Sequence, residues 1–308
     1  KTSKFERGST SLSMNPKFFD DHLKINLNAN FSLVNNRFAE GVEGTAIMFD
    51  PTQPIYDPDS PFGGYFEYHN NGEPNNAPRN PVASLMQTRN TSYVERFYGN
   101  FEIDYKFHFL PELRAVVNLG YDNSSGDGSY FRSEESINGF RTGNNQPFLG
   151  SESYYTSKRT NRLLDGYLAY NKDFDNFGLE LTAGYSYQKF EGEGYNSGEL
   201  KDPDSESDIS INPDIVLIGY FARTNLSFDE KYLLTLSYRR DGTSRFSEDN
   251  RWGNFPAAAF AWKLSEEDFL KGSETLSTLK MRLGWGITGQ QDIPASYAYL
   301  GRYVTGDN

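Results

Sequence analysis

The chain has 308 residues, a net charge of -12 at pH 7, 16% aromatic residues and no cysteine. The lack of cysteine excludes disulfides, thiol catalysis and cysteine-ligated metals from this chain, and its acidity argues against nucleic acid as a partner. Mean hydropathy is -0.70, and a polar mean with so many aromatic residues is typical of alternating strands rather than disorder. There is no run of about 18 apolar residues, so no transmembrane helix is predicted, although membrane strands remain open.

The first elements predict a β-hairpin. A short strand at Ser9–Met14 is followed by a turn at Asn15–Asp21 and by a longer strand at Leu23–Leu33. In the longer strand apolar and polar residues alternate without exception, which is the period-two signature of a strand with two different faces. Its length is about that needed to cross a bilayer on a tilt.

The same pattern recurs along the chain. Further alternating strands are predicted at 97–109, 113–121, 164–170, 179–187, 220–228, 232–238, 258–264 and 279–287. Their bulky apolar and aromatic side chains share one face, while polar and charged side chains share the other. We therefore expect about ten strands in about five antiparallel hairpins, and an all-β fold.

Short and long connections alternate between these strands. Within each hairpin a tight turn joins the two strands. Long polar segments join one hairpin to the next, at about 35–92, 122–157 and 191–214. This asymmetry is typical of an outer-membrane barrel with short periplasmic turns and long extracellular loops. Aromatic residues of the kind that form an interfacial girdle stand beside the short turns: Phe18, Phe19, Phe107, Phe109, Phe174, Phe177, Phe228 and Tyr232. The alternative is a soluble all-β protein with irregular loops.

Several segments resemble one family. They are Tyr232–Thr235, Arg239–Phe246, Asn250–Pro256, Leu279–Arg282 and Gly286–Gln291, with Phe49–Pro54 and Phe107–Pro111 earlier in the chain. In combination they closely resemble the SusC/RagA family of TonB-linked outer-membrane transporters. The likeness runs along most of the chain.

The resemblance implies a 22-stranded barrel filled by an N-terminal plug domain, with a TonB-contacting segment and a lid-like SusD-type lipoprotein partner. It implies a glycan or a peptide as cargo. The chain starts in mid-pattern at Lys1 and ends in loop-like sequence at Asn308. We therefore expect residues 1–308 to be a middle portion of the barrel, without the plug, the TonB-contacting segment and about half of the strands.

Two groups of residues are candidates for contact with cargo or a partner. Exposed aromatic residues in loops can stack on sugar rings or on peptide side chains; the candidates are Tyr65, Phe66, Tyr68 and Trp252. The alternative is that these rings pack among the loops or against a lid protein. A charge network at the rim is expected from Arg239, Arg240, Asp241 and Arg245, with loop ordering as its alternative role.

Other motifs carry weaker signals. The acidic residues Asp202, Asp204, Glu206 and Asp208 could hold Ca²⁺, but they lack EF-hand spacing, and a solvated loop is favoured. The histidines His22, His69 and His108 are scattered and predict no zinc or triad site. Residues Gly284–Gly289 match G-x-G-x-x-G, but a strand face continues through them where a dinucleotide site requires a helix. No catalytic constellation and no cofactor are predicted.

Two hypotheses follow. The favoured one is a barrel segment of a TonB-dependent importer in the Gram-negative outer membrane, with outer-membrane lipid around it and with no enzymatic role. Its partners would be a SusD-like lipoprotein, the TonB complex through a part outside this chain, and glycan or peptide cargo. The other is a soluble or surface-attached β-protein that binds glycans without transporting them.

Overall fold

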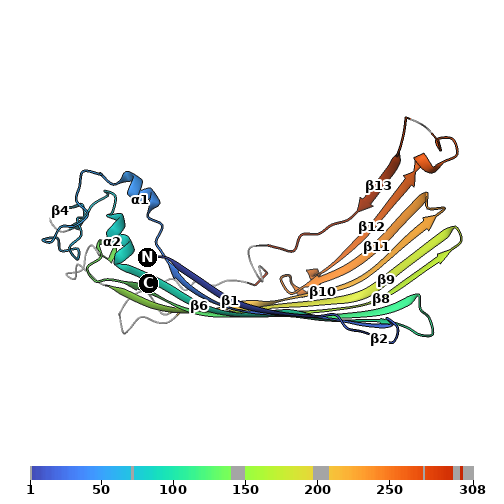
Figure 1. The fold of residues 1–308 in the computed structure, drawn as a ribbon, viewed down its shortest axis with the longest axis horizontal. Helices are drawn as coiled ribbons and strands as arrows, with labels where there is room; N and C mark the ends of the chain where they lie inside the picture. Colours follow the sequence, from blue (N-terminus) through green and yellow to red (C-terminus); the bar gives the residue numbers. More distant parts are fainter. Residues whose placement is uncertain are drawn as a thin grey trace.

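The computed structural model describes residues 2–70, 73–139, 150–196, 208–272, 275–293 and 299–300. These residues form one long, curved antiparallel sheet with a lobe of loops and short helices at one end (Figure 1). The sheet order is β1-β3-β6-β7-β8-β9-β10-β11-β12-β13, with β2 beside β3. Each long strand therefore pairs with its neighbour in the chain, and the sheet does not close on itself in Figure 1.

The bounds of the strands in this sheet are β1 Lys4–Met14, β2 Lys17–Phe18, β3 Leu23–Phe38, β6 Thr88–Lys106, β7 Leu113–Arg132, β8 Ser151–Phe174, β9 Phe177–Asn196, β10 Asp208–Phe228, β11 Tyr232–Thr243, β12 Trp252–Lys263 and β13 Lys280–Gly286. The remaining elements are α1 Glu43–Met48, α2 Pro81–Met86, the small pair β4 His69–Asn70 and β5 Glu73–Pro74, and the 3-10 turns η1 Ile137–Gly139, η2 Glu248–Asn250 and η3 Leu264–Glu266. Within the described residues no helix has the length and hydropathy needed to cross a membrane.

The register places apolar side chains on one face and polar ones on the other. One row across five strands consists of Leu27, Phe101, Leu119, Leu164 and Tyr187. The adjacent row on the other face consists of Asn26, Glu102, Asn118, Asp165 and Ser186. We call the apolar side the outward face and the polar side the inward face. The two-faced alternation predicted from the sequence is confirmed.

Hydrogen bonds between side chains cross the inward face. Ser13 donates to Asn28 at 2.8 Å, and Asn28 donates to Asn100 at 3.2 Å. Asn26 likewise donates to Glu102 at 2.7 Å. Because these cross-strand pairs satisfy one another, the inward face can remain polar without leaving its amides unmatched.

Aromatic residues gather at the short turns. The rings of Phe174 and Phe177 lie 6.1 Å apart across one turn, and those of Phe228 and Tyr232 lie 6.4 Å apart across another. Beside them, the Tyr232 hydroxyl and the Trp262 indole N–H donate to the Glu267 carboxylate at 2.6 and 2.9 Å. An apolar ring body with a hydrogen-bonded polar tip is the arrangement expected at a membrane–water interface.

The connections predicted as loops were too long in three places. β7 continues to Arg132 and β8 begins at Ser151, so half of the expected loop at 122–157 is strand. β9 and β10 likewise extend into 191–214, and the 35–92 segment contains α1, α2 and the ends of β3 and β6. For β7, β8 and β9 the reason is that polar side chains dominate both faces of the extensions, so the backbone ladder continues where the alternation of apolar and polar residues has ceased. In the opposite direction, β6 ends at Lys106, so Phe107 and Phe109 belong to a turn.

The best-packed side chains lie in the lobe and not in the sheet. We define the lobe as residues 39–87 together with the 133–139 turn that packs on it. Phe62, Asn80 and Ser136 are fully buried there, and Ala83 and Ile137 nearly so. In the sheet Val116 is the one apolar side chain among those described that reaches this degree of burial. The sheet therefore depends mainly on its backbone ladder, whereas the lobe has a small core of its own.

Replacing Leu119 with arginine should destabilise the whole protein in a bilayer, while arginine at the adjacent Asn118 should be tolerated. Leu119 points outward in the middle of the apolar band, where arginine costs about 2–4 kcal/mol. Asn118 points inward between its register partners Glu102 and Asp165, which would pair with the new charge. The unfolding midpoints of the two reconstituted variants measure the difference, and equal effects would contradict the assignment of the faces.

Candidate functional site

Three of the aromatic residues singled out in the sequence lie together in the lobe. Phe66 and Tyr68 contact each other at 5.2 Å between ring centroids, and both contact Phe49, at 6.3 and 5.7 Å. Tyr65 packs on a different ring, Tyr56, at 5.5 Å. All three are half-buried, so each is partly engaged in packing and partly accessible. Sequence reasoning missed Phe49 and Tyr56 as members of this cluster, although Phe49 opens a segment that resembles the family.

The buried side chain of Asn80 organises the lobe around these rings. Its amide nitrogen donates to the carbonyls of Ile55 and Phe66 at 2.8 and 3.1 Å. Its amide oxygen caps α2 by accepting from the N–H groups of Val82 and Ala83. One residue therefore ties the aromatic segment to the start of a helix. Capping by asparagine is favoured because it satisfies N–H groups that have no partner within the helix.

Glu67 provides the other buried polar contact of the lobe. Both of its carboxylate oxygens accept from the backbone N–H of Asn80, at 3.2 and 3.0 Å. Burial raises the pKa of Glu67, and this effect is only partly offset by the Asn80 N–H and by the charge of Arg79. Nearby, the Thr52 N–H and hydroxyl donate to Asp50 and lower its pKa. Asp50 and Glu67, which adjoin the aromatic residues in the sequence, therefore lie in different electrostatic environments.

Trp252 does not join this cluster. It lies at the start of β12, and its register partner Gly242 is on the outward face. There its ring stacks on Tyr220 at 6.2 Å, and the Arg240 guanidinium lies over it at 5.2 Å. The structure therefore separates Trp252 from the three lobe residues, because strand parity directs it to the side away from the interior. Its surroundings resemble an interfacial aromatic with a cationic neighbour.

The four charged residues expected at the rim do not form one network. Arg239 pairs with Asp241, whereas Arg245 pairs with a residue outside this group. Arg239 points inward and forms a two-point contact with Asp241, at 3.0 and 3.2 Å. Gly219 on the next strand leaves room for this pair, since a Cβ there would lie 2.6 Å from an Asp241 oxygen. Arg240 points outward, as strand alternation requires. Arg245 binds elsewhere, through Asp292 at 3.2 Å and the Ile293 carbonyl at 2.7 Å.

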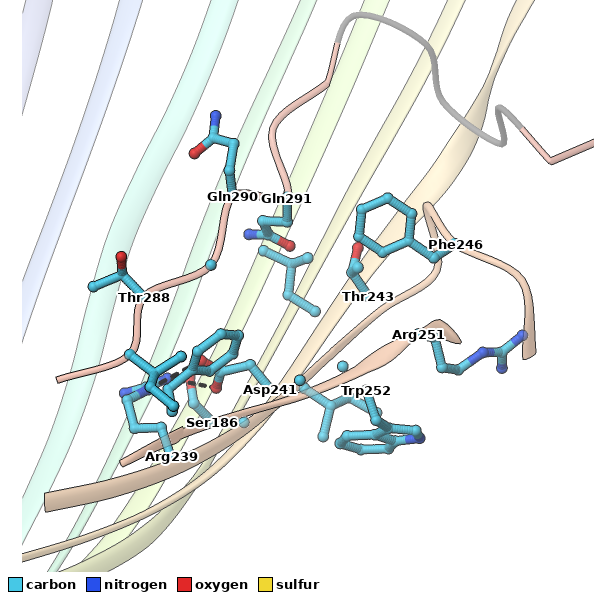
Figure 2. A pocket seen from close by; sticks show the side chains of 18 of the residues that line it. Ser186, Arg239, Asp241, Thr243, Phe246, Arg251, Trp252, Thr288, Gln290 and Gln291 are labelled. Atoms are coloured by element: carbon cyan, nitrogen blue, oxygen red, sulfur yellow. Dashed lines mark hydrogen bonds and ion pairs between the residues drawn. The ribbon is translucent and has the colours of Figure 1, made fainter. Parts of the chain in front are cut away.

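The chain turns onto the inward face after β13. We call residues 287–293 the strap. The Ile287 N–H donates to the Pro256 carbonyl at 3.0 Å, and Arg245 holds the far end of the strap. Between the strap and the inward face of β10–β12 is a cleft of about 630 Å³. Figure 2 shows Thr288, Gln290 and Gln291 on the strap, on the opposite side of the cleft from the Arg239–Asp241 pair. The sequence marked this segment only as a family-like motif and not as part of a site.

The metal and nucleotide candidates gain no support. Asp202, Asp204 and Glu206 lie outside the described residues, as does the side chain of Asp208. Among the residues that the structure does describe, no group of three His, Asp or Glu side chains could hold a metal. Residues 284–289 span the end of β13 and the strap, with no helix after them in the part described.

Two of the histidines expected to be scattered are in contact. The rings of His22 and His108 stack at 4.0 Å between centroids, at the turn end of the sheet. His22 Nδ1 donates to the Lys106 carbonyl at 2.7 Å, since a carbonyl can only accept. The sequence could not reveal the pair, because it forms between two hairpins that are far apart in the chain.

Comparison with known proteins assigns the family. Residues 6–298 match the family described as "TonB dependent receptor-like, beta-barrel". This chain belongs to that TonB-dependent receptor family. The SusC-type resemblance inferred from the motifs is confirmed by a relative, "TonB-dependent receptor SusC" of Bacteroides thetaiotaomicron, which is 38% identical across 99% of this chain. "TonB-dependent receptor P26" of Formosa agariphila is 31% identical across 89% of it.

Two solved structures share the fold. The "RagAB peptide importer in the 'closed-closed' state" matches 96% of this chain with a TM-score of 0.70 at 18% identity. The "RagAB peptide transporter" matches 92% with a TM-score of 0.69 at 17% identity. This TonB-dependent receptor chain spans only about a third of the length of its relatives, 32% of SusC and 34% of the first of these structures.

Replacing Asn80 with alanine should loosen the lobe while leaving the sheet intact. The change removes the α2 cap and the donors to two carbonyls, at a cost of about 2–3 kcal/mol to local stability. Hydrogen exchange should quicken for amides in 55–87 and remain slow in β7–β9. Asn76→Ala, at an exposed position of the same lobe, is the matched control. Unchanged exchange in Asn80→Ala would show that Asn80 does not hold the lobe together.

The stability of the lobe should fall as pH rises through the folded pKa of Glu67. The pKa of this carboxyl is raised in the folded lobe, so the protonated form is favoured there. The corresponding stabilisation is fully present below the usual glutamate range and is lost above the raised pKa. Hydrogen exchange of the lobe, corrected for the intrinsic effect of pH, should show this slope in the native protein. Glu67→Gln should abolish it, and a slope that persists in this variant would contradict the assignment.

Proposed function

We propose that this chain is a wall segment of an outer-membrane importer that takes up glycans or peptides with energy supplied through TonB. The observation that carries the proposal is a two-faced sheet of long antiparallel strands in a chain of the TonB-dependent receptor family. The outward face is apolar over about the height of a bilayer, and the inward face is polar and cross-linked by hydrogen bonds. Nothing in the chain would perform chemistry on the cargo, and transport would follow from conformational coupling to the inner membrane.

Residues 1–308 would serve as one domain of a longer protein. A plug, a TonB-contacting segment and the remaining strands would be supplied by parts outside this chain. A SusD-like lipoprotein would cover the extracellular end, where the lobe lies. The RagAB structures carry the words "peptide importer" in their titles, and at 18% identity they support the fold rather than the cargo.

The alternative of a soluble glycan-binding protein is disfavoured by the outward face. Its large side chains are exposed along several strands, including Leu119, Leu168, Leu236, Leu283 and Trp285. No second sheet covers them among the described residues. A water-soluble sandwich would bury this face, whereas a barrel presents it to lipid.

The lobe aromatics are proposed to contact cargo or the lid protein. Phe66 and Tyr68 are half-buried against Phe49, which holds them in place while leaving part of each ring accessible. Rigid rings of this kind lose little entropy on binding. Trp252 would instead stabilise the upper border of the apolar band.

Tyr68→Ala in the full-length protein should weaken cargo binding or lid binding roughly two- to tenfold, the range expected from the loss of one aromatic contact. The full-length protein is extracted from membranes, and the proteins that purify with it are identified by mass spectrometry. Uptake of cargo is measured in cells from which the native gene for this protein has been deleted. Tyr154→Ala, which changes an exposed aromatic residue on β8 outside the lobe, is the control. A parent protein that stays soluble without detergent and brings down no lipoprotein would contradict the importer.

A further inference from the structure

Three segments that are far apart in the sequence meet at the cleft under the strap. They are the end of β11 with its following loop, the start of β12, and the strap after β13. All three had been singled out for their family-like motifs, at Arg239–Phe246, Asn250–Pro256 and Gly286–Gln291, and each contributes to the lining of the cleft. The importer as described above gives them no role. Their convergence on one cavity indicates a built site.

The position of the strap is fixed from both ends. A hydrogen bond from the Ile287 N–H attaches its start to β12, and the two contacts of Arg245 attach its end to the loop after β11. In the middle, Gly289 lies close to the edge of the Phe255 ring, where an added Cβ would lie 2.5 Å from a ring carbon. The cleft is therefore held open between two supported walls and does not depend on a free loop.

The lining of the cleft is rich in neutral donors and acceptors. Hydroxyl groups come from Ser186, Ser237, Thr243 and Thr288, and side-chain amides come from Gln188, Asn250, Gln290 and Gln291. Each amide offers both a donor and an acceptor, and each hydroxyl can act as either. Apart from its charged residues, the rest of the lining is apolar or glycine and includes Phe246 and Phe255, so the cleft suits a ligand that has both hydroxyl groups and apolar faces.

Three charged side chains line the cleft, and two of them neutralise each other. Arg239 and Asp241 bind each other at two points, and Arg251 extends away from the strap in Figure 2. A charged ligand would have to separate the Arg239–Asp241 pair, whereas a neutral ligand can accept from the guanidinium edge and donate to the carboxylate. A volume of about 630 Å³ also lies within the range of small-molecule sites.

We propose that this cleft is a binding site for a neutral oligosaccharide on the inward wall. Adjacent hydroxyls of a sugar would bridge Arg239 and Asp241, and further hydroxyls would contact Gln290 and Gln291 of the strap. This proposal rests on the proposed import function and names its cargo class. Cargo would then contact the inward face of the barrel wall, in addition to the aromatic residues of the lobe that are proposed to contact it.

The test uses the detergent-solubilised full-length protein and titration calorimetry. The probes are a series of neutral hexose oligosaccharides of increasing length, a uronic-acid series and a series of neutral peptides. The cleft variants are Asp241→Ala and the double substitution Gln290→Ala/Gln291→Ala. Arg223→Ala is the matched control, because Arg223 lies on the same inward face but outside the lining of the cleft. Retention of the folded barrel is checked for every variant by its gel mobility before heating.

We expect a neutral oligosaccharide to bind, both cleft variants to weaken it at least tenfold, and Arg223→Ala to leave it unchanged. If the cleft variants bind the oligosaccharide as tightly as the unmodified protein does, the proposed site is overturned, but the proposed import function is not. Binding of only peptides or uronic acids would overturn the neutral-sugar class. If the cleft variants fold less well but their affinity for sugar is unchanged, the cleft binds another segment of the same protein and not sugar, and the proposed site is overturned. If no probe binds and cells show no uptake, the proposed function itself fails.

Discussion

The structure depends on one constraint, which is that each long strand must pair its backbone with both neighbours while sending alternate side chains into two different environments. The register is unbroken over most pairs and shifts once, between Asn212 and Ile215. A slip of one residue would exchange the two faces of a strand, so the alternation itself fixes the register. β1 and β13 have a partner on one side only within the described sheet, and a barrel resolves such open edges by closing the ladder.

The parts of the fold predicted from sequence are those in which the two environments differ. Within the apolar band, alternation located all ten long strands and their order. Beyond it, the ends of β7, β8 and β9 were missed because polar side chains dominate both faces there, so no pattern distinguishes strand from loop. The family was accessible from motifs such as Arg239–Phe246, because several matched in combination.

The parts of the site that could not be predicted are those made by contacts between distant segments. Asn80 followed by Pro81 is a sequence signal for the start of a helix, but nothing in the sequence shows that the Asn80 amide also reaches the carbonyls of Ile55 and Phe66. Trp252 shows a related effect: it stands in a loop-like sequence, but it is the first residue of β12 and strand parity directs its ring outward. The strap was marked by its motif, but its return to the inward face follows only from the three-dimensional path of the chain. The sheet is thus predictable from local patterns, and the cleft and the lobe are not.

The most direct test of the central claim asks which face meets lipid. The chain contains no cysteine, so single cysteines can be introduced along β7 in a cysteine-free full-length protein and spin-labelled in bilayers. Collision with oxygen, which partitions into lipid, should dominate at positions 115, 117, 119 and 121, and should fall at the positions between them. The account predicts this alternation with period two along the strand. Uniform exposure to a water-soluble relaxant, or the same accessibility on both faces, would contradict a barrel wall in a membrane.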